Sequence, residues 1–299
     1  MKRLAPWLPC TDCDNPIIVD EQYMLDYFNG LQVECQKCNA KLIWWELVKN
    51  GIIQNFMFSQ AFSAIGATST ILDFFLKENE RTIFKFSDYG IPETAKILRV
   101  NYTPQGGGLF PLEVHGNDAS RKQRSDQVVL YPMPIGDGEI TETKVSAFVT
   151  WVEHSNIDTS WKSMISAFEA YTSDDLESAI VPANVAVESV LTPVLFNYIN
   201  KHVGKDRVKR FLDDAATYSH QLNVVLPLIV SILGLPKIGD HIRGLLNKLR
   251  GYRNDIAHQG ATEGNLNKEE VAEMLCASLF AFYYIKYLGI TLEKTIQNQ

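Results

Sequence analysis

The stretch GYRNDIAH at residues 251–258 brings three side chains suited to phosphate chemistry within six residues, namely Arg253, Asn254 and His258. Histidine has an unperturbed pKa near neutrality, so it suits proton transfer to or from a 2′-hydroxyl or a leaving oxygen. Arginine stays charged at every physiological pH and can bind two phosphate oxygens, which suits the charge that develops on a phosphorane. These residue types are the ones that cleavage of RNA without a catalytic metal would require.

The spacing of the three residues sets a geometric condition on such a site. Asn254 and His258 are four residues apart and share one face of a helix, whereas Arg253 and His258 are five apart and differ by about 140° around it. Arg253 must therefore reach around the helix or point at a groove shared with a second copy of the chain. Tyr252 and Asp255, in the same stretch, are expected to support the site.

Positive charge gathers around this stretch, although the chain as a whole carries a net charge of −7. Residues 237–258 contain five Lys or Arg side chains against two Asp, and we expect four of them to bind RNA: Lys237, Arg243, Lys248 and Arg250. Residues 201–210, KHVGKDRVKR, are a second candidate phosphate-binding stripe, and a solvated helix face explains that stripe equally well. The acidic overall charge argues against a protein that coats nucleic acid by bulk electrostatics.

Four of the five cysteines form two Cys-x-x-Cys pairs, Cys10 with Cys13 and Cys35 with Cys38. Each pair can direct two thiolates at one point, and two pairs complete a tetrahedron around zinc. The sequence therefore predicts one structural zinc ion per chain, because so small a lobe cannot build its own core. A role of this lobe in recognising nucleic acid or a protein is the alternative. Cys276 lies in an apolar helical run and is interpreted as a core residue.

Three regions with different sequence periods must position these residues, and they predict an α+β multidomain fold. Residues 1–49 are expected to form a zinc ribbon. Residues 50–157 contain short runs of β-branched and aromatic residues between turn signals, which are typical of an antiparallel β-sandwich. Residues 158–299 change to a period of 3.6 and predict an all-α bundle of four or five helices.

The stretch GYRNDIAH resembles the Arg-polar-x-x-x-His signature of the HEPN superfamily, whose helical domains include many metal-independent endoribonucleases. The resemblance covers about residues 160–290, and the segment AIVPANVAVESVL is similar to earlier HEPN helices that carry an acidic residue, here Glu188. It implies catalytic roles for Arg253, Asn254 and His258, and a homodimer in which two motifs face one another. The three-part architecture resembles bacterial toxins and anti-phage abortive-infection proteins.

Two functions from different classes follow from these patterns. The first is an endoribonuclease that cuts RNA through 2′-hydroxyl attack, under the control of an unidentified trigger or regulatory protein. The second is a non-catalytic module that binds nucleic acid or protein and dimerises through its helical domain. We expect a cytoplasmic location without a membrane partner, because no secretory signal precedes the polar segment TDCDN and the apolar run at 224–236 is shorter than a bilayer span.

Overall fold

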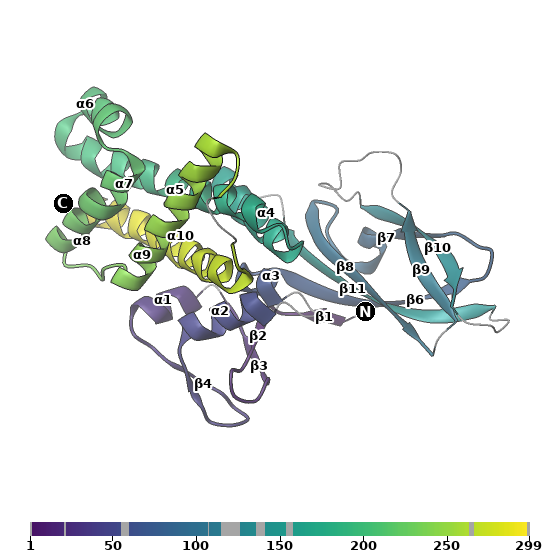
Figure 1. The fold of residues 1–299 in the computed structure, drawn as a ribbon. Coiled ribbons are helices and arrows are strands. Elements are labelled where there is room, and N and C mark those ends of the chain that lie inside the picture. Colours follow the sequence, from purple (N-terminus) through teal and green to yellow (C-terminus); the bar gives the residue numbers. More distant parts are fainter. Residues whose placement is uncertain are drawn as a thin grey trace. The chain divides into compact units, whose positions relative to one another are not determined.

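The computed structural model describes residues 2–20, 22–54, 60–106, 108–114, 126–135, 141–153, 158–262 and 266–297. Its fold is mixed α/β, with an N-terminal cysteine cluster, antiparallel sheets and C-terminal helices (Figure 1). The chain divides into two compact units. Unit 1 comprises Met1–Leu8 and Asn55–Ile157, and unit 2 comprises Pro9–Gln54 and Asp158–Gln299.

Unit 1 contains the long strands of the chain, and these form two antiparallel sheets. The four-stranded sheet has, in spatial order, β1 (Lys2–Leu4), β6 (Thr68–Lys77), β11 (Glu142–Glu153) and β8 (Ala95–Gln105). The three-stranded sheet has β7 (Thr82–Lys85), β10 (Gln127–Pro134) and β9 (Leu109–Val114). A short helix, α3 (Gln60–Ala64), and a 3₁₀ turn, η1 (Phe86–Tyr89), complete the described part of the unit.

Alternation of side chains along the strands gives unit 1 its core. On β10, Val128 and Leu130 are buried while Tyr131 and Met133 are exposed. The buried side chains of both sheets belong to one hydrophobic cluster, which includes Trp151 of β11. The period-two pattern of this region predicts antiparallel sheets, and the structure contains them.

Small strands flank the cysteines: β2 (Trp7–Pro9) pairs with β3 (Pro16–Ile18), and β4 (Val33–Glu34) pairs with β5 (Lys41–Leu42). Helices α1 (Tyr23–Phe28) and α2 (Trp44–Gln54) belong to the same segment. The C-terminal helices are α4 (Thr159–Thr172), α5 (Leu176–Val203), α6 (Lys205–Arg210), α7 (Tyr218–His220), α8 (Leu226–Ile232), α9 (Asp240–Gln259) and α10 (Lys268–Gln297). Two π-helical turns, η2 (Phe211–Ala215) and η3 (Gln221–Val225), lie between α6 and α8.

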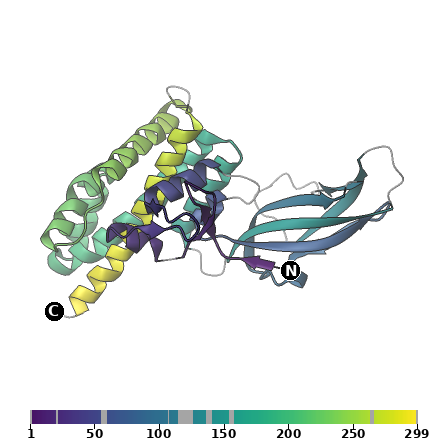
Figure 2. The same cartoon turned by 90° about the horizontal axis from the view of Figure 1, so that it is seen from below.

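Helix α10 is the centre of unit 2. Every residue from Val271 to Ile285 except Glu273 and Tyr283 is buried, as expected for a helix that is apolar on all sides. Helices α1, α2, α4, α5 and α9 all contact it, and Figure 2 shows α10 in yellow running through the unit beside α1 and α2. Cys276 is fully buried in α10, which confirms its interpretation as a core residue.

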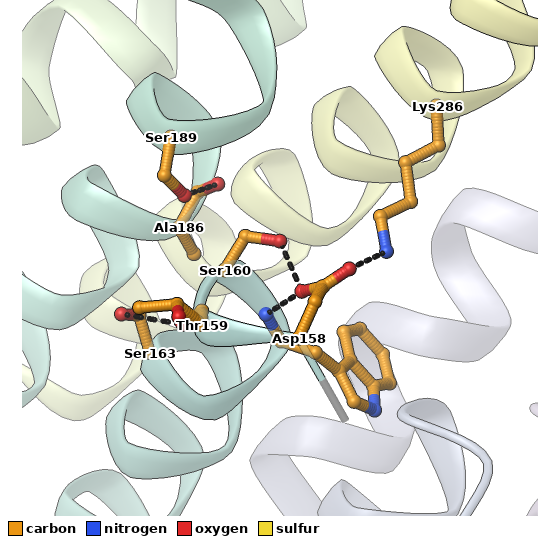
Figure 3. A network of polar contacts seen from close by, with 8 residues as sticks. Asp158, Thr159, Ser160, Ser163, Ala186, Ser189 and Lys286 are labelled. Carbon is orange, nitrogen blue, oxygen red and sulfur yellow. Dashed lines mark hydrogen bonds and ion pairs between the residues drawn. The ribbon is translucent and has the colours of Figure 1, made fainter. Parts of the chain in front are cut away.

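Asp158 caps α4 and ties it to α10 (Figure 3). Its Oδ1 accepts hydrogen bonds from the Trp161 backbone N–H at 2.8 Å and from the Ser160 hydroxyl, and its Oδ2 lies 2.8 Å from Lys286 Nζ. Desolvation raises the pKa of Asp158, but the Lys286 ammonium and the two other donors outweigh it and lower this pKa to about 2. The Asp158 side chain therefore accepts from a backbone N–H at the start of α4 and pairs with Lys286 of α10.

The two units differ from the three predicted regions in how they divide the N-terminal segment. Residues 1–8 cluster with the sheets because β1 pairs with β6, with Lys2 opposite Ile71. Residues 9–54 cluster with the helices because aromatic side chains of α1 and α2 pack on α10. The rings of Tyr27 and Trp45 lie 4.5 Å and 5.3 Å from that of Phe280.

Two helices within the described residues have the length and hydropathy of membrane spans, α5 and the Lys268–Glu293 part of α10. Buried core helices share this property, and half or more of each apolar window is buried inside unit 2.

Candidate functional site

The last turns of α9 carry the Arg–Asn–His set. Arg253 and Asn254 are half-buried, and Arg253 Nη1 donates a hydrogen bond to Asn254 Oδ1 at 3.2 Å. His258 is exposed and makes no hydrogen bond or ion pair with a described residue. The helix ends at Gly260, whose φ of 79° is a left-handed conformation that glycine adopts without strain. The imidazole is therefore open to a ligand.

The helix register places the set on two faces. Ile242, Leu246 and Leu249 form the buried stripe of α9, and Arg253 follows four residues after Leu249 on the same side. Arg250, Asn254 and His258, at intervals of four residues, form a second stripe. The guanidinium of Arg253 and the imidazole of His258 thus project from different faces, and among the described residues no contact joins them.

Glu270, in the first turn of α10, holds two of the predicted site residues. Its Oε1 accepts a hydrogen bond from Tyr252 Oη at 2.6 Å and lies 2.7 Å from Lys248 Nζ. Lys248 and Tyr252 lower the pKa of Glu270, and the hydrogen bond to Glu270 raises the pKa of Tyr252. Tyr252 and Lys248 therefore tie α9 to α10, whereas Asp255 makes no hydrogen bond or ion pair with a described residue.

The four predicted RNA-binding cations lie in different surroundings. Arg243 is paired with Asp240 at 2.6 Å, and Lys248 is paired with Glu270. Lys237 precedes α9, whose axis extends about 27 Å from Asp240 to His258 at 1.5 Å per residue. Within the described residues, Arg250 has no ion-pair partner. Of these four, Arg250 is the one that combines an unpaired charge with a position near His258.

A cluster of polar side chains beside α9 was missed by sequence reasoning. On α5, Asn184 is 1% exposed and donates Nδ2 to Glu188 Oε2 at 3.4 Å. Thr192 donates to Gln221 Oε1 at 2.8 Å, and Asn223 exchanges two hydrogen bonds with Asn247 of α9. These bonds connect α5, η3 and α9.

One signal for this cluster was present in the sequence. Asn184 and Glu188 interrupt the apolar run AIVPANVAVESVL at a spacing of four residues, which places both on one helix face. Sequence reasoning singled out Glu188 and left out Asn184. Tyr218 of α7, also buried here, gave no such signal, because its neighbours come from other helices.

The four N-terminal cysteines form a second candidate site. Their Sγ atoms all lie within 4.8 Å of one another, with Cys10 and Cys38 at 3.8 Å and Cys13 and Cys35 at 3.7 Å. A tetrahedron with metal–sulfur bonds of about 2.3 Å has edges of about 3.8 Å, so the sulfur spacing fits a tetrahedral ion. The cluster could therefore hold a metal ion of the size and preferences of zinc.

Two matching turns build this cluster. In each, the first cysteine donates its N–H to the carbonyl five residues on, Cys10 to Asn15 and Cys35 to Ala40, both within 3.0 Å. The residue after the second cysteine, Asp14 or Asn39, has a φ near +60°, a conformation that Asp and Asn tolerate. Backbone N–H groups of Cys38 and Lys37 lower the pKa of Cys35 to about 6, which favours the thiolate that a metal requires.

Comparisons of the chain with known protein families, with curated proteins and with solved structures find no match.

Proposed function

We propose that this protein is a metal-independent endoribonuclease of the HEPN type, acting in the cytoplasm as a toxin or anti-phage abortive-infection effector. One observation supports the proposal above others. At the exposed end of α9, His258 and two arginines lie within nine residues, and none of the three has a carboxylate partner among the described residues. The other two α9 cations, Arg243 and Lys248, are both neutralised.

In the proposed reaction, His258 takes the proton of a ribose 2′-hydroxyl or gives one to the leaving 5′-oxygen. The 2′-oxygen attacks the phosphorus, the bond to the 5′-oxygen breaks, and a cyclic phosphate remains. Arg253 stabilises the negative charge that builds up on the phosphorane. Asn254 orients the Arg253 guanidinium through the hydrogen bond to its Oδ1.

The opposite faces of Arg253 and His258 favour a composite site in a homodimer. With both groups fixed on one helix about 140° apart, a second copy can supply the guanidinium that meets the imidazole. We further propose that the ion of the cysteine cluster is a structural zinc. It would contribute folding free energy to the N-terminal segment and take no part in the reaction.

The test is cleavage of a labelled single-stranded RNA by purified protein and single variants, with brief addition of EDTA. His258→Ala and Arg253→Ala should each lower the rate by about 10²–10⁴-fold. Asn254→Ala should lower it less, because an amide neither moves a proton nor carries charge. Brief chelation should leave the rate unchanged, and the products should end in a cyclic phosphate.

His220→Ala is the matched control, because His220 is an exposed histidine of α7 that hydrogen-bonds Thr217 and has no role in the proposed site. A fully active His258→Ala variant would contradict the proposed chemistry, as would cleavage that depends on added magnesium. A wild-type chain that dimerises and binds RNA without cutting it would instead support the non-catalytic module.

A further inference from the structure

Of the five buried polar atoms that lack a hydrogen-bond partner among the described residues, three belong to side chains near the proposed site: Asn184 Oδ1 on α5, Tyr218 Oη on α7 and Arg250 Nε on α9. Buried polar atoms in proteins are nearly always paired, because an unpaired one costs free energy. Asn184 and Tyr218 are 1% and 9% exposed, so solvent does not satisfy them. Because these three unpaired atoms lie beside the proposed site, we expect a functional reason for them.

The hydrogen-bond register shows that these residues lie at one level of the helical unit. Gln221 accepts a hydrogen bond from Thr192. Tyr218 lies one helical turn before Gln221, and Glu188 lies one helical turn before Thr192. Asn223 bonds Asn247, and one turn after Asn247 is Arg250. Because Glu177 of α5 accepts hydrogen bonds from Thr262, which follows α9, α5 and α9 run antiparallel. The step from Thr192 back to Glu188 on α5 and the step from Asn247 forward to Arg250 on α9 therefore run in the same direction. Both lead towards the end of α9 that carries His258.

Electrostatics agrees with this placement. Burial is the main cause that raises the pKa of Tyr218, the charge of Glu188 raises it further and the charge of Arg250 lowers it. Both charges therefore act on the phenol. Glu188 has Asn184 Nδ2 as a hydrogen-bond donor and is half-buried, and its carboxylate has the capacity to accept further hydrogen bonds.

The Arg250 guanidinium has an inner and an outer end. Its Nε is buried without a partner, whereas its Nη groups are not among the buried unpaired atoms and make no hydrogen bond to a described residue. The Nη groups therefore reach solvent. A guanidinium whose inner end is buried, whose charge acts on the Tyr218 phenol and whose outer edge is free is arranged to bind an anion from outside.

We propose that Arg250 is a second phosphate ligand of the RNA site, and that Tyr218 and Glu188 position its guanidinium; this inference rests on the proposed function. Arg250 and His258 share a stripe but lie about 12 Å apart along the axis of α9. Arg250 therefore binds a phosphate next to the one that reacts at His258. The site takes an extended single strand of more than one nucleotide, with Arg250 contributing to binding more than to the chemical step.

The test measures RNA binding in full-length protein that carries His258→Ala, so that cleavage does not interfere. The probe is a fluorescein-labelled, mixed-sequence, single-stranded RNA of 20 nucleotides, and anisotropy gives Kd over a series of salt concentrations. Arg250→Ala should weaken binding about tenfold and reduce the slope of log K against log salt by about 0.7, the value for one phosphate contact on a single strand. Arg250→Lys should restore part of the affinity, because it keeps the charge without the fork.

Tyr218→Phe tests the positioning role, since it removes the hydroxyl and keeps the ring. It should weaken binding about threefold alone and have no further effect in the Arg250→Ala background. In the catalytically intact chain, Arg250→Ala should raise KM with little change in kcat. Two controls should bind as the parent does: Arg81→Ala, an exposed arginine of unit 1, and Tyr171→Phe, which removes another buried and unpaired phenol of unit 2.

The outcomes separate this inference from the function on which it rests. A parent protein that fails to bind RNA would overturn both. A parent that binds, together with an Arg250→Ala variant of equal affinity and salt slope, would overturn the second phosphate contact alone. If the effects of Tyr218→Phe and Arg250→Ala on the free energy of RNA binding add in full, Tyr218 does not act through Arg250.

Discussion

At the scale of single residues, the environment of a side chain decides its role more than its type does. Arg243 and Arg250 are identical in type and seven residues apart on α9, yet Asp240 pairs with the first and no described carboxylate pairs with the second. A charge already paired gains little from a phosphate, because binding must first break the pair. This difference is the reason to rank Arg250 above Arg243 as an RNA contact.

The five thiols should also differ in reactivity. Burial raises the pKa of Cys276 well above its ordinary value, and the thiolate is the form that alkylating reagents attack. With metal chelated, iodoacetamide should modify Cys10, Cys13, Cys35 and Cys38 and leave Cys276 unmodified. Peptide mass spectrometry gives the result, and addition of denaturant, which should expose Cys276, serves as the positive control. Modification of Cys276 in the folded protein would contradict its place in α10.

Sequence reasoning found the candidate residues that lie close together in the chain. The cysteine pairs were predictable because each turn is local, and their convergence within 4.8 Å follows from metal-ligand spacing. The stretch containing His258 was recognisable for the same reason. Tyr218 was not predictable, because its significance comes from charges on α5 and α9, which lie 30 or more residues away in the sequence.

At the scale of elements, α4 offers a test of helix capping coupled to an ion pair. The pKa of Asp158 is about 2 in the folded protein, below the value of about 3.9 in an unfolded chain. Its ionised form therefore contributes stability that is fully present above about pH 4 and is lost as the pH falls towards 2. Asp158→Ala should lower the free energy of unfolding by about 1 kcal/mol at pH 7.

Thermal unfolding followed by circular dichroism measures this effect. The destabilisation by Asp158→Ala should shrink steadily between pH 4 and pH 2. Asp175, which caps α5 by accepting from the Ser178 N–H at 3.2 Å and has no ion-pair partner among the described residues, is the matched control for a cap without an ammonium. An Asp158→Ala effect that is constant from pH 7 to pH 2 would contradict the contribution of charge.

The elements themselves were largely predictable, because their periods are local. The switch from period two to period 3.6 near residue 158 corresponds to the end of β11 and the start of α4. The pairing of β1 with β6 was not predictable from the sequence. A strand of three residues carries too little pattern to identify a partner strand more than 60 positions away. The packing of α1 and α2 was also not predictable. Their aromatic side chains indicate an apolar face, but they do not indicate that α10 covers that face.

At the scale of the whole molecule, the cysteine cluster predicts a metal requirement for folding. Purified protein should contain about one zinc per chain by elemental analysis. Cys35→Ser should lower the melting temperature of the helical signal, because residues 9–54 pack with the helices of unit 2. Cys276→Ser is a control that changes a cysteine outside the cluster. Metal-free protein with an unchanged melting profile would contradict a structural ion.

The proposed composite site predicts a homodimer with two-fold symmetry. Light scattering at micromolar concentration should return twice the mass of the 33.8 kDa chain. A monomer at that concentration, both alone and with RNA, would remove the second copy from the mechanism. Arg253 would then have to act on the substrate from the side of the helix opposite His258.

The division of unit 2 between Pro9–Gln54 and Asp158–Gln299 has a consequence for synthesis on the ribosome. Tyr27 and Trp45 emerge early, whereas Phe280, on which their rings pack, emerges more than 230 residues later. At about 5–20 residues per second, the aromatic face of the first segment stays uncovered for roughly 10 to 50 s. A metal ion captured by the four cysteines during that interval would keep the nascent segment compact, so zinc starvation should increase aggregation of newly made chains more than it affects protein already folded.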